Sequence, residues 1–70
     1  MNWISTPESS TIAGFEYSTQ DQVLTVEFKD GARYNYFDVP ESIFEGMKGA
    51  VSKGQFLAQQ LRGTYRYARL

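Results

Sequence analysis

The sequence predicts an α+β domain in which a three-stranded antiparallel sheet, in the order strand-strand-strand-helix-helix, is covered on one face by two helices. Two observations predict this class. Three short runs with strand-like character come first, and two segments with apolar residues at helical spacing follow them. Strands followed by helices, rather than alternating with them, are typical of α+β domains. Because 70 residues leave room for one domain only, we expect residues 1–70 to form a single unit, with residues 1–8 as a polar lead-in.

The three strand-like runs differ in regularity. In the second run, Leu24 to Phe28, apolar residues alternate with more polar ones, as in a strand with one buried face. The first run is irregular, because Ile12, Phe15 and Tyr17 can share one face only across a bulge. Gly14 is the residue that interrupts the alternation there. The predicted strands are residues 11–17, 23–28 and 33–37.

The loop length of the hairpin between the second and third strands is predicted from the alternation of side chains between the two faces of each strand, which we call parity. A two-residue turn at Asp30-Gly31 would pair Phe28 with Arg33 and mix apolar with polar faces. A three-residue loop that ends at Gly31, in a left-handed conformation, keeps one face apolar throughout. This loop predicts the cross-strand pairs Phe28 with Ala32, Val26 with Tyr34, and Leu24 with Tyr36.

Two helices are predicted to follow the strands. The first begins at Pro40, with acidic residues near its start, and its apolar positions extend to Val51. The second begins at Ser52, which with Gln55 fits a capping box, and ends before Gly63. The apolar positions are Ile43, Phe44, Met47, Ala50 and Val51 in the first helix, and Phe56, Leu57 and Leu61 in the second.

Composition excludes several classes of function. The chain has no cysteine and no histidine, so disulfides, thiolate nucleophiles, zinc-finger ligand sets and histidine general bases are excluded. No apolar run approaches the ~18 residues of a membrane span, and no signal-peptide pattern is present. The sequence therefore predicts a cytoplasmic, non-catalytic protein with no metal, no cofactor and no membrane contact.

Two patterns that could carry chemistry are better explained by structure. The segment 49–56 has the glycine spacing of a phosphate-binding loop, but Gln55 and Phe56 stand where lysine and serine or threonine are required. Asp38, Glu41 and Glu45 lie at helical spacing, yet acidic residues are expected at the start of a helix because of its dipole. Neither pattern predicts a catalytic or metal site.

The charges are distributed unevenly along the chain. Residues 1–45 hold all eight acids with only Lys29 and Arg33, a net charge of −6, whereas residues 46–70 hold five cations and no acid, a net charge of +5. One interpretation is a basic surface that meets an anionic partner. The other is that the two halves pack together and partly neutralise each other.

Aromatic residues accompany the cations near the C-terminus and occur in pairs in the third strand. Tyr34 and Tyr36 have the spacing with which RNA-binding sheets stack bases, although parity places both on the face that the helices should cover, or at its rim. Interleaved arginines and tyrosines after Gly63 combine the two elements of single-strand binders. Alternatively, these tyrosines tie the tail to the sheet while the arginines are solvated. The candidate nucleic-acid-binding residues are Tyr34, Tyr36, Lys53, Arg62, Tyr65, Arg66, Tyr67 and Arg69.

The same residues resemble the KTSC domain, a bacterial module found at the C-terminus of some lysyl-tRNA synthetases and as a small stand-alone protein. The resemblance runs over residues 9–67. It rests on Ser9-Ser10 before Ile12, Tyr17, Val26-Glu27-Phe28, Gly31, Tyr34-Asn35-Tyr36, Val39-Pro40, Ser52-Lys53-Gly54 with Phe56, and Arg62 followed by Tyr65. It implies no catalytic residue, and attachment to a synthetase suggests that the module binds RNA, either tRNA or a single strand. The alternative is a protein-interaction module that uses exposed aromatics.

Overall fold

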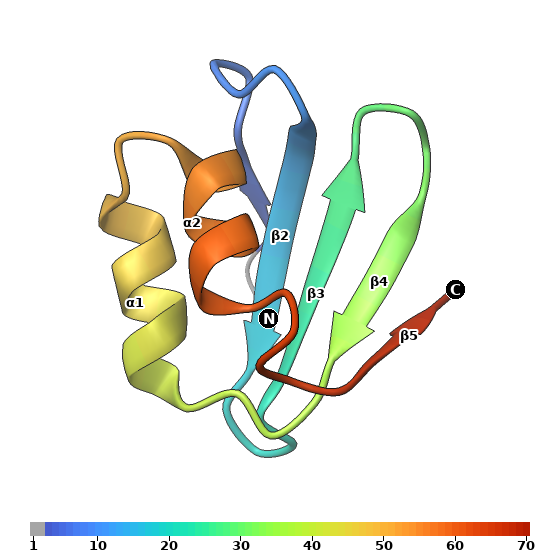
Figure 1. Ribbon diagram of the computed structural model, residues 1–70, viewed down its shortest axis with the longest axis vertical. Coiled ribbons are helices and arrows are strands. Elements are labelled where there is room, and N and C mark those ends of the chain that lie inside the picture. The colour runs from blue at the N-terminus through green and yellow to red at the C-terminus, as the bar shows by residue number, and fades with distance from the viewer. Residues whose placement is uncertain (1–2) are drawn as a thin grey trace.

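The computed structural model describes residues 3–70 of the chain. Its elements follow the order β1-β2-β3-β4-α1-α2-β5 (Figure 1). Their bounds are β1 Ile4–Ser5, β2 Ile12–Ser18, β3 Val23–Phe28, β4 Arg33–Tyr36, α1 Glu41–Gly49, α2 Lys53–Gln60 and β5 Tyr67–Arg69. The α+β class is therefore confirmed, with two helices on one antiparallel sheet.

The five strands form one antiparallel sheet in the order β1-β2-β3-β4-β5. In Figure 1 the helices lie on the side of the sheet near β2, and β4 and β5 extend beyond them on the other side. Side chains on the helix side of these last two strands are consequently less covered than those of β2 and β3. This asymmetry positions the candidate site.

The prediction of three strands was wrong, because the sheet has five. β1 contains two residues, too few to show any alternation, and lies in the segment that we expected to be a polar lead-in. β5 lies in the predicted tail, and the amide of Leu70 donates to the carbonyl of Arg33 at 2.8 Å. The amide of Phe37 donates to the carbonyl of Arg66 at 2.9 Å, so main-chain hydrogen bonds rather than apolar burial attach this strand.

The bulge and the hairpin were predicted correctly. The pairing of β2 with β3 shifts register between Ile12 and Gly14, and the three apolar residues of β2 that needed a bulge are all buried. At the hairpin Gly31 has a φ of 96°, and the amide of Phe28 donates to the carbonyl of Ala32 at 2.8 Å. The predicted cross-strand pairs are present, Leu24 with Tyr36 and Val26 with Tyr34.

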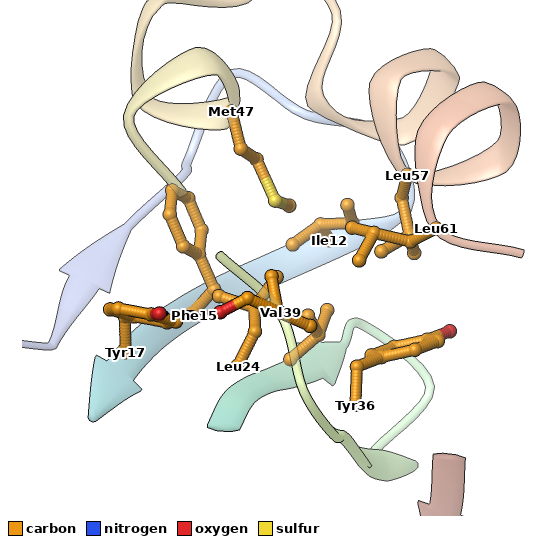
Figure 2. Close-up of a cluster of buried hydrophobic side chains, with 10 residues drawn as sticks. Ile12, Phe15, Tyr17, Leu24, Tyr36, Val39, Met47, Leu57 and Leu61 are labelled. Carbon is orange, nitrogen blue, oxygen red and sulfur yellow. Dashed lines mark hydrogen bonds between the residues drawn. The ribbon is translucent and has the colours of Figure 1, made fainter. Parts of the chain in front are cut away.

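The core lies between the helices and the covered face of the sheet (Figure 2). The strands β2, β3 and β4 and both helices contribute buried side chains to it, and Tyr17 closes one end by donating its hydroxyl to the carbonyl of Val39. The buried hydrophobic residues are Ile12, Phe15, Tyr17, Leu24, Val26, Tyr36, Val39, Met47, Leu57 and Leu61.

The ends of α2 agree with prediction, whereas both ends of α1 differ from it. Ser52 caps α2 as expected, since its hydroxyl accepts from the amide of Gln55 at 3.3 Å, and Gly63, with a φ of 77°, lies in the turn after the helix. However, α1 starts at Glu41 with Pro40 as its N-cap, and the chain turns extended at Ala50. Val51 is therefore fully exposed rather than part of the apolar face.

Candidate nucleic-acid interface

Four aromatic rings gather on the helix side of the sheet, at the part that the helices leave open. Tyr34 lies at the centre, with ring centroids 5.5 Å from Phe28, 6.4 Å from Tyr36 and 5.6 Å from Tyr67. The rings of Tyr36 and Tyr67 are 5.8 Å apart. We call this group the tyrosine cluster. A hollow of about 310 Å³ opens on it, lined by Phe28, Tyr34, Tyr36, Arg62, Gly63 and Tyr67.

Strand register places these rings together. Tyr36 pairs with Tyr67 across β4 and β5, and Tyr34 pairs with Arg69, so all four side chains project from the same face. Phe28 joins them from the end of β3, because Val26 pairs with Tyr34 and Phe28 is the next residue on that face. The cluster is thus a direct consequence of the three-residue hairpin loop and of the attachment of β5.

The three tyrosines differ in exposure. Tyr36 is 3% exposed and belongs to the core, Tyr34 is partly buried against it, and Tyr67 is 59% exposed. The prediction that Tyr34 and Tyr36 lie on the helix-covered face or at its rim is confirmed. Burial raises the pKa of the Tyr36 phenol, and the positive charge of Arg62 partly offsets this effect. Tyr67 is the ring that solvent and a ligand can reach.

Three of the five cations of the C-terminal half lie within ion-pair distance of a carboxylate. Lys48 lies 3.0 Å from Glu45, Lys53 lies 3.8 Å from Glu8, and Arg66 lies 3.3 Å from Asp38. The interpretation that the two halves of the chain partly neutralise each other is therefore confirmed for three of the five cations. Two of the five cations, Arg62 and Arg69, make no ion pair within residues 3–70.

Both of these unpaired arginines lie at the tyrosine cluster. The guanidinium of Arg69 lies 6.0 Å from the ring centroid of Tyr34, and Arg62 lines the hollow itself. A smaller hollow of about 140 Å³ on the other side of Tyr34 is lined by both arginines and also by Asp30. The candidate interface therefore combines accessible aromatic surface with two cations. Asp30 is the one acidic residue among those that line the two hollows.

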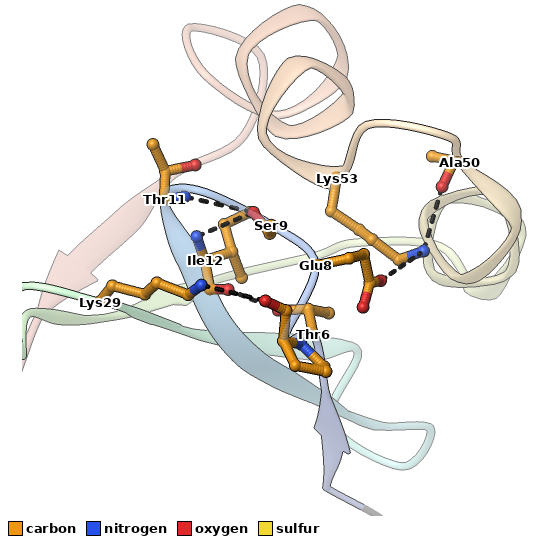
Figure 3. A network of polar contacts seen from close by, with 9 residues as sticks. Thr6, Glu8, Ser9, Thr11, Ile12, Lys29, Ala50 and Lys53 are labelled. Atoms are coloured by element: carbon orange, nitrogen blue, oxygen red, sulfur yellow. Dashed lines mark hydrogen bonds and ion pairs between the residues drawn. The ribbon is translucent and has the colours of Figure 1, made fainter.

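Lys53 occupies a different environment from the two arginines. Its side chain is 14% exposed, and its ammonium group donates to the carbonyl of Ala50 at 3.0 Å beside Glu8 (Figure 3). In the same network Ser9 accepts from the amides of Thr11 and Ile12, which fixes the start of β2. Lys53 thus connects α2 to the segment before β2, and the structure does not bring it to the tyrosine cluster.

Arg66 and Tyr65 also lie outside the tyrosine cluster. Arg66 packs over the ring of Phe37 with 5.4 Å between its guanidinium and the ring centroid, in addition to its pair with Asp38. Tyr65 is partly buried against the core. Of the eight candidate residues, the structure brings together Tyr34, Tyr36, Arg62, Tyr67 and Arg69.

Sequence reasoning did not include Phe28 in the site. The available signal was its position on the same strand face as Leu24 and Val26, which assigned it to the core. It lies at the end of β3, however, where the helices no longer cover the sheet, so its ring forms an edge-to-face contact with Tyr34 and lines the hollow.

A larger hollow lies elsewhere on the molecule but offers weaker chemistry. It measures about 720 Å³ and is lined by Ile4, Tyr17, Ser18, Thr19, Gln20, Asp21, Phe44 and Lys48. Its one cation, Lys48, is paired with Glu45, and Asp21 adds negative charge. Within residues 3–70 no group of three potential metal ligands occurs, and no helix there is both long and apolar enough to cross a membrane.

Both the fold and the sequence of this chain match one known protein family. The crystal structure of a KTSC domain protein from Yersinia pestis superimposes with a TM-score of 0.90 and 27% sequence identity, covering 99% of this chain and 96% of that one. The sequence model of the KTSC domain matches residues 8–65. The chain belongs to the KTSC domain family, as its sequence resemblance implied.

The relatives are of two kinds. The lysine–tRNA ligase of Nostoc punctiforme is 41% identical over 64 residues, and that of Trichormus variabilis is 39% identical over 64 residues. Each match covers 91% of this chain but 11% of the ligase. An uncharacterized protein of Stutzerimonas stutzeri is 34% identical over 64 residues, which is 90% of each chain. The module thus occurs both within a long ligase and in proteins of about its own length.

Proposed function

We propose that this KTSC domain binds RNA through the tyrosine cluster together with Arg62 and Arg69. One observation carries the proposal: Arg62 and Arg69, two of the three cations without an ion pair in residues 3–70, lie at the tyrosine cluster, where the ring of Tyr67 is exposed. Aromatic rings that stack bases, next to cations that contact phosphates, are the two elements of single-stranded nucleic-acid sites.

The proposal gives each side chain a role. Tyr67 supplies the stacking surface, because its ring is exposed and held by contacts with Tyr34 and Tyr36. Base–aromatic stacking contributes roughly 1–3 kcal/mol per base. Arg62 and Arg69 contact the phosphates on either side, and Arg66 and Lys53 contribute less because carboxylates already neutralise them.

The ligase relatives support this proposal by analogy. These relatives are lysine–tRNA ligases, and a module that binds RNA is compatible with attachment to an enzyme of that name. We extend the inference to this chain together with the cytoplasmic location that the sequence predicts. A site with two phosphate contacts is expected to bind non-specifically, with a Kd on the order of 10⁻⁴ to 10⁻⁶ M at physiological salt.

The proposal is tested by fluorescence anisotropy with a labelled single-stranded RNA at several salt concentrations. Replacing Arg62 and Arg69 together with glutamine should weaken binding by about tenfold, as expected for two exposed charge interactions. It should also reduce the log-log salt slope by about 1.4, because each single-strand phosphate contact contributes about −0.7. Arg66→Gln is the matched control, because its loss of charge leaves the interface unchanged, and its slope should stay close to that of the wild type.

Two results of these binding measurements would contradict the proposal. If the wild-type protein binds neither single-stranded RNA nor tRNA at low salt, the proposal is wrong. If Arg66→Gln reduces the log-log salt slope by half as much as the Arg62 and Arg69 double variant does, every charge contributes equally. RNA binding would then depend on the overall charge of the protein and not on this interface.

The second candidate function, protein interaction, is favoured by the opposite face of the sheet. Trp3 is 39% exposed there, lies against Gly14, and has the guanidinium of Arg33 5.5 Å from its ring centroid. An exposed tryptophan beside an arginine is typical of interaction hot spots. Loss of a partner protein on Trp3→Ala, with RNA binding absent, would favour this alternative.

A further inference from the structure

A second hollow adjoins the one at the tyrosine cluster and lies along α2. It measures about 480 Å³, shares Phe28 and Arg62 with the first hollow and extends to the start of the helix. The second hollow is lined by Ser10, Thr11, Phe28, Ser52, Gly54, Gln55, Leu57, Ala58 and Arg62. Because Phe28 and Arg62 line both hollows, the two hollows adjoin, and we call them together the α2 groove.

The dimensions of the α2 groove exceed those of a single nucleotide. Its lining residues run from Ser52 to Arg62, and the eight residues of α2 between them rise about 12 Å. Its walls near the middle are low, because Gly54 has no side chain and Ala58 has only a methyl group. Gly54 also packs tightly on Thr11, since a Cβ atom there would lie 2.7 Å from the Thr11 hydroxyl oxygen.

The chemistry of the groove changes along its length. The tyrosine end holds the aromatic rings and the unpaired arginines, whereas the far end holds the hydroxyls of Ser10, Thr11 and Ser52. Negative charge does not line the second hollow, and Glu8, which lies beyond its far end, is paired with Lys53. Hydroxyls and amides of this kind hydrogen-bond to the sugar 2′-hydroxyl and to phosphate oxygens.

We infer that the ligand is an extended, unpaired RNA segment of several nucleotides that leaves the tyrosine cluster and follows the α2 groove. This inference rests on the proposed function and deepens it. A duplex is excluded from this path because its bases are stacked internally, so none can lie on Tyr67. A lone nucleotide would use the tyrosine end and leave the rest of the groove unoccupied.

The test compares NMR titrations with a uridine dinucleotide, a uridine hexanucleotide and a short RNA hairpin. Two variants carry the same substitution on the same helix. Gln55→Glu adds a negative charge within the groove, and Gln60→Glu adds one to an exposed position that does not line it. Both positions are exposed, so neither change disturbs the core.

The hexanucleotide should bind at least about tenfold more tightly than the dinucleotide, because additional phosphates and bases gain contacts along the groove. Gln55→Glu should weaken hexanucleotide binding by about threefold, the size expected of one exposed charge interaction, and leave dinucleotide binding unchanged. Gln60→Glu should leave both unchanged. The hairpin stem should cause no shifts in the groove.

Three results would overturn the inference while leaving the proposed function intact. One is equal affinity for the dinucleotide and the hexanucleotide, which would confine the ligand to the tyrosine end. Another is an equal effect of Gln55→Glu and Gln60→Glu on the hexanucleotide. The third is hairpin affinity equal to that of the hexanucleotide. If no RNA binds at low salt, the proposed function and this inference fall together.

Discussion

Tyr36→Ala separates a structural role of this ring from a role in stacking bases. The Tyr36 side chain is 3% exposed and packs against Leu24 of the core and against Tyr34 and Tyr67 of the tyrosine cluster. A buried tyrosine removes roughly 150–200 Å² from water, which at about 25 cal/mol per Å² amounts to ~4 kcal/mol. Truncation of large core aromatics typically costs ~3–5 kcal/mol, in agreement with this figure.

The size of this loss matters because the domain is small. A chain of 70 residues is expected to have a total stability of about 4–10 kcal/mol. The variant should therefore retain at most about 60% of that free energy of unfolding, and none of it at the lower end of the range. Urea unfolding followed by circular dichroism measures it, with Tyr36→Phe as the control. The Tyr36 hydroxyl points away from the buried cluster in Figure 2, so the control should differ from wild type by about 0.5 kcal/mol or less.

The result that would refute this reasoning is specific. If Tyr36→Ala kept the wild-type free energy of unfolding but lost RNA binding, Tyr36 would be a stacking surface and its burial in the core would be wrong. Tyr67→Ala provides the opposite expectation, because that ring is 59% exposed. It should weaken RNA binding with a stability change of about 1 kcal/mol or less.

The remaining predictions concern single contacts of the fold. Burial raises the pKa of the Tyr17 phenol in the folded protein. The free energy of unfolding that depends on the neutral phenol is therefore complete below the pKa of an unfolded tyrosine, about 10, and is lost as the pH rises through the pKa of the folded state. In alkaline urea titrations Tyr17→Phe should show a smaller loss of stability with pH than the wild type. At neutral pH the same variant should lose about 1 kcal/mol, because its hydroxyl bonds a main-chain carbonyl. Gly14→Ala should displace Trp3, whose ring atoms lie 2.6 Å from the added Cβ, and shift its fluorescence to longer wavelength at a cost of about 1–2 kcal/mol. Gly31→Ala should lose about 1 kcal/mol in thermal unfolding, because its φ of 96° is unfavourable for alanine. An unchanged emission spectrum or unchanged unfolding midpoints would show these contacts to be unimportant.

The parts of the fold that depend on local pattern were predictable from sequence. Side-chain parity fixed the register of β3 and β4, because a slip of one residue would have moved Leu24 and Val26 to the open face. The same rule required the bulge near Gly14. Ser52 indicated the start of α2, because a serine side chain at this position accepts a hydrogen bond from a main-chain amide of the first helical turn.

The parts that depend on distant contacts were not predictable in this way. β5 forms because main-chain groups of β4 are available at the sheet edge, and its residues Tyr67–Arg69 are all exposed, so they carry no apolar signal. The ion pairs of Lys53 with Glu8 and of Arg66 with Asp38 join residues far apart in sequence. Five cations in an acid-free stretch therefore looked equivalent, and only the fold distinguishes Arg62 and Arg69 from the rest.

An NMR titration of isotope-labelled protein with single-stranded RNA and tRNA, at two salt concentrations, tests the central claim most directly. The proposed interface predicts chemical-shift changes at Tyr34, Arg62, Gly63 and Tyr67 that diminish at the higher salt concentration. No change at low salt with excess RNA, or changes confined to the opposite face around Trp3, would contradict it.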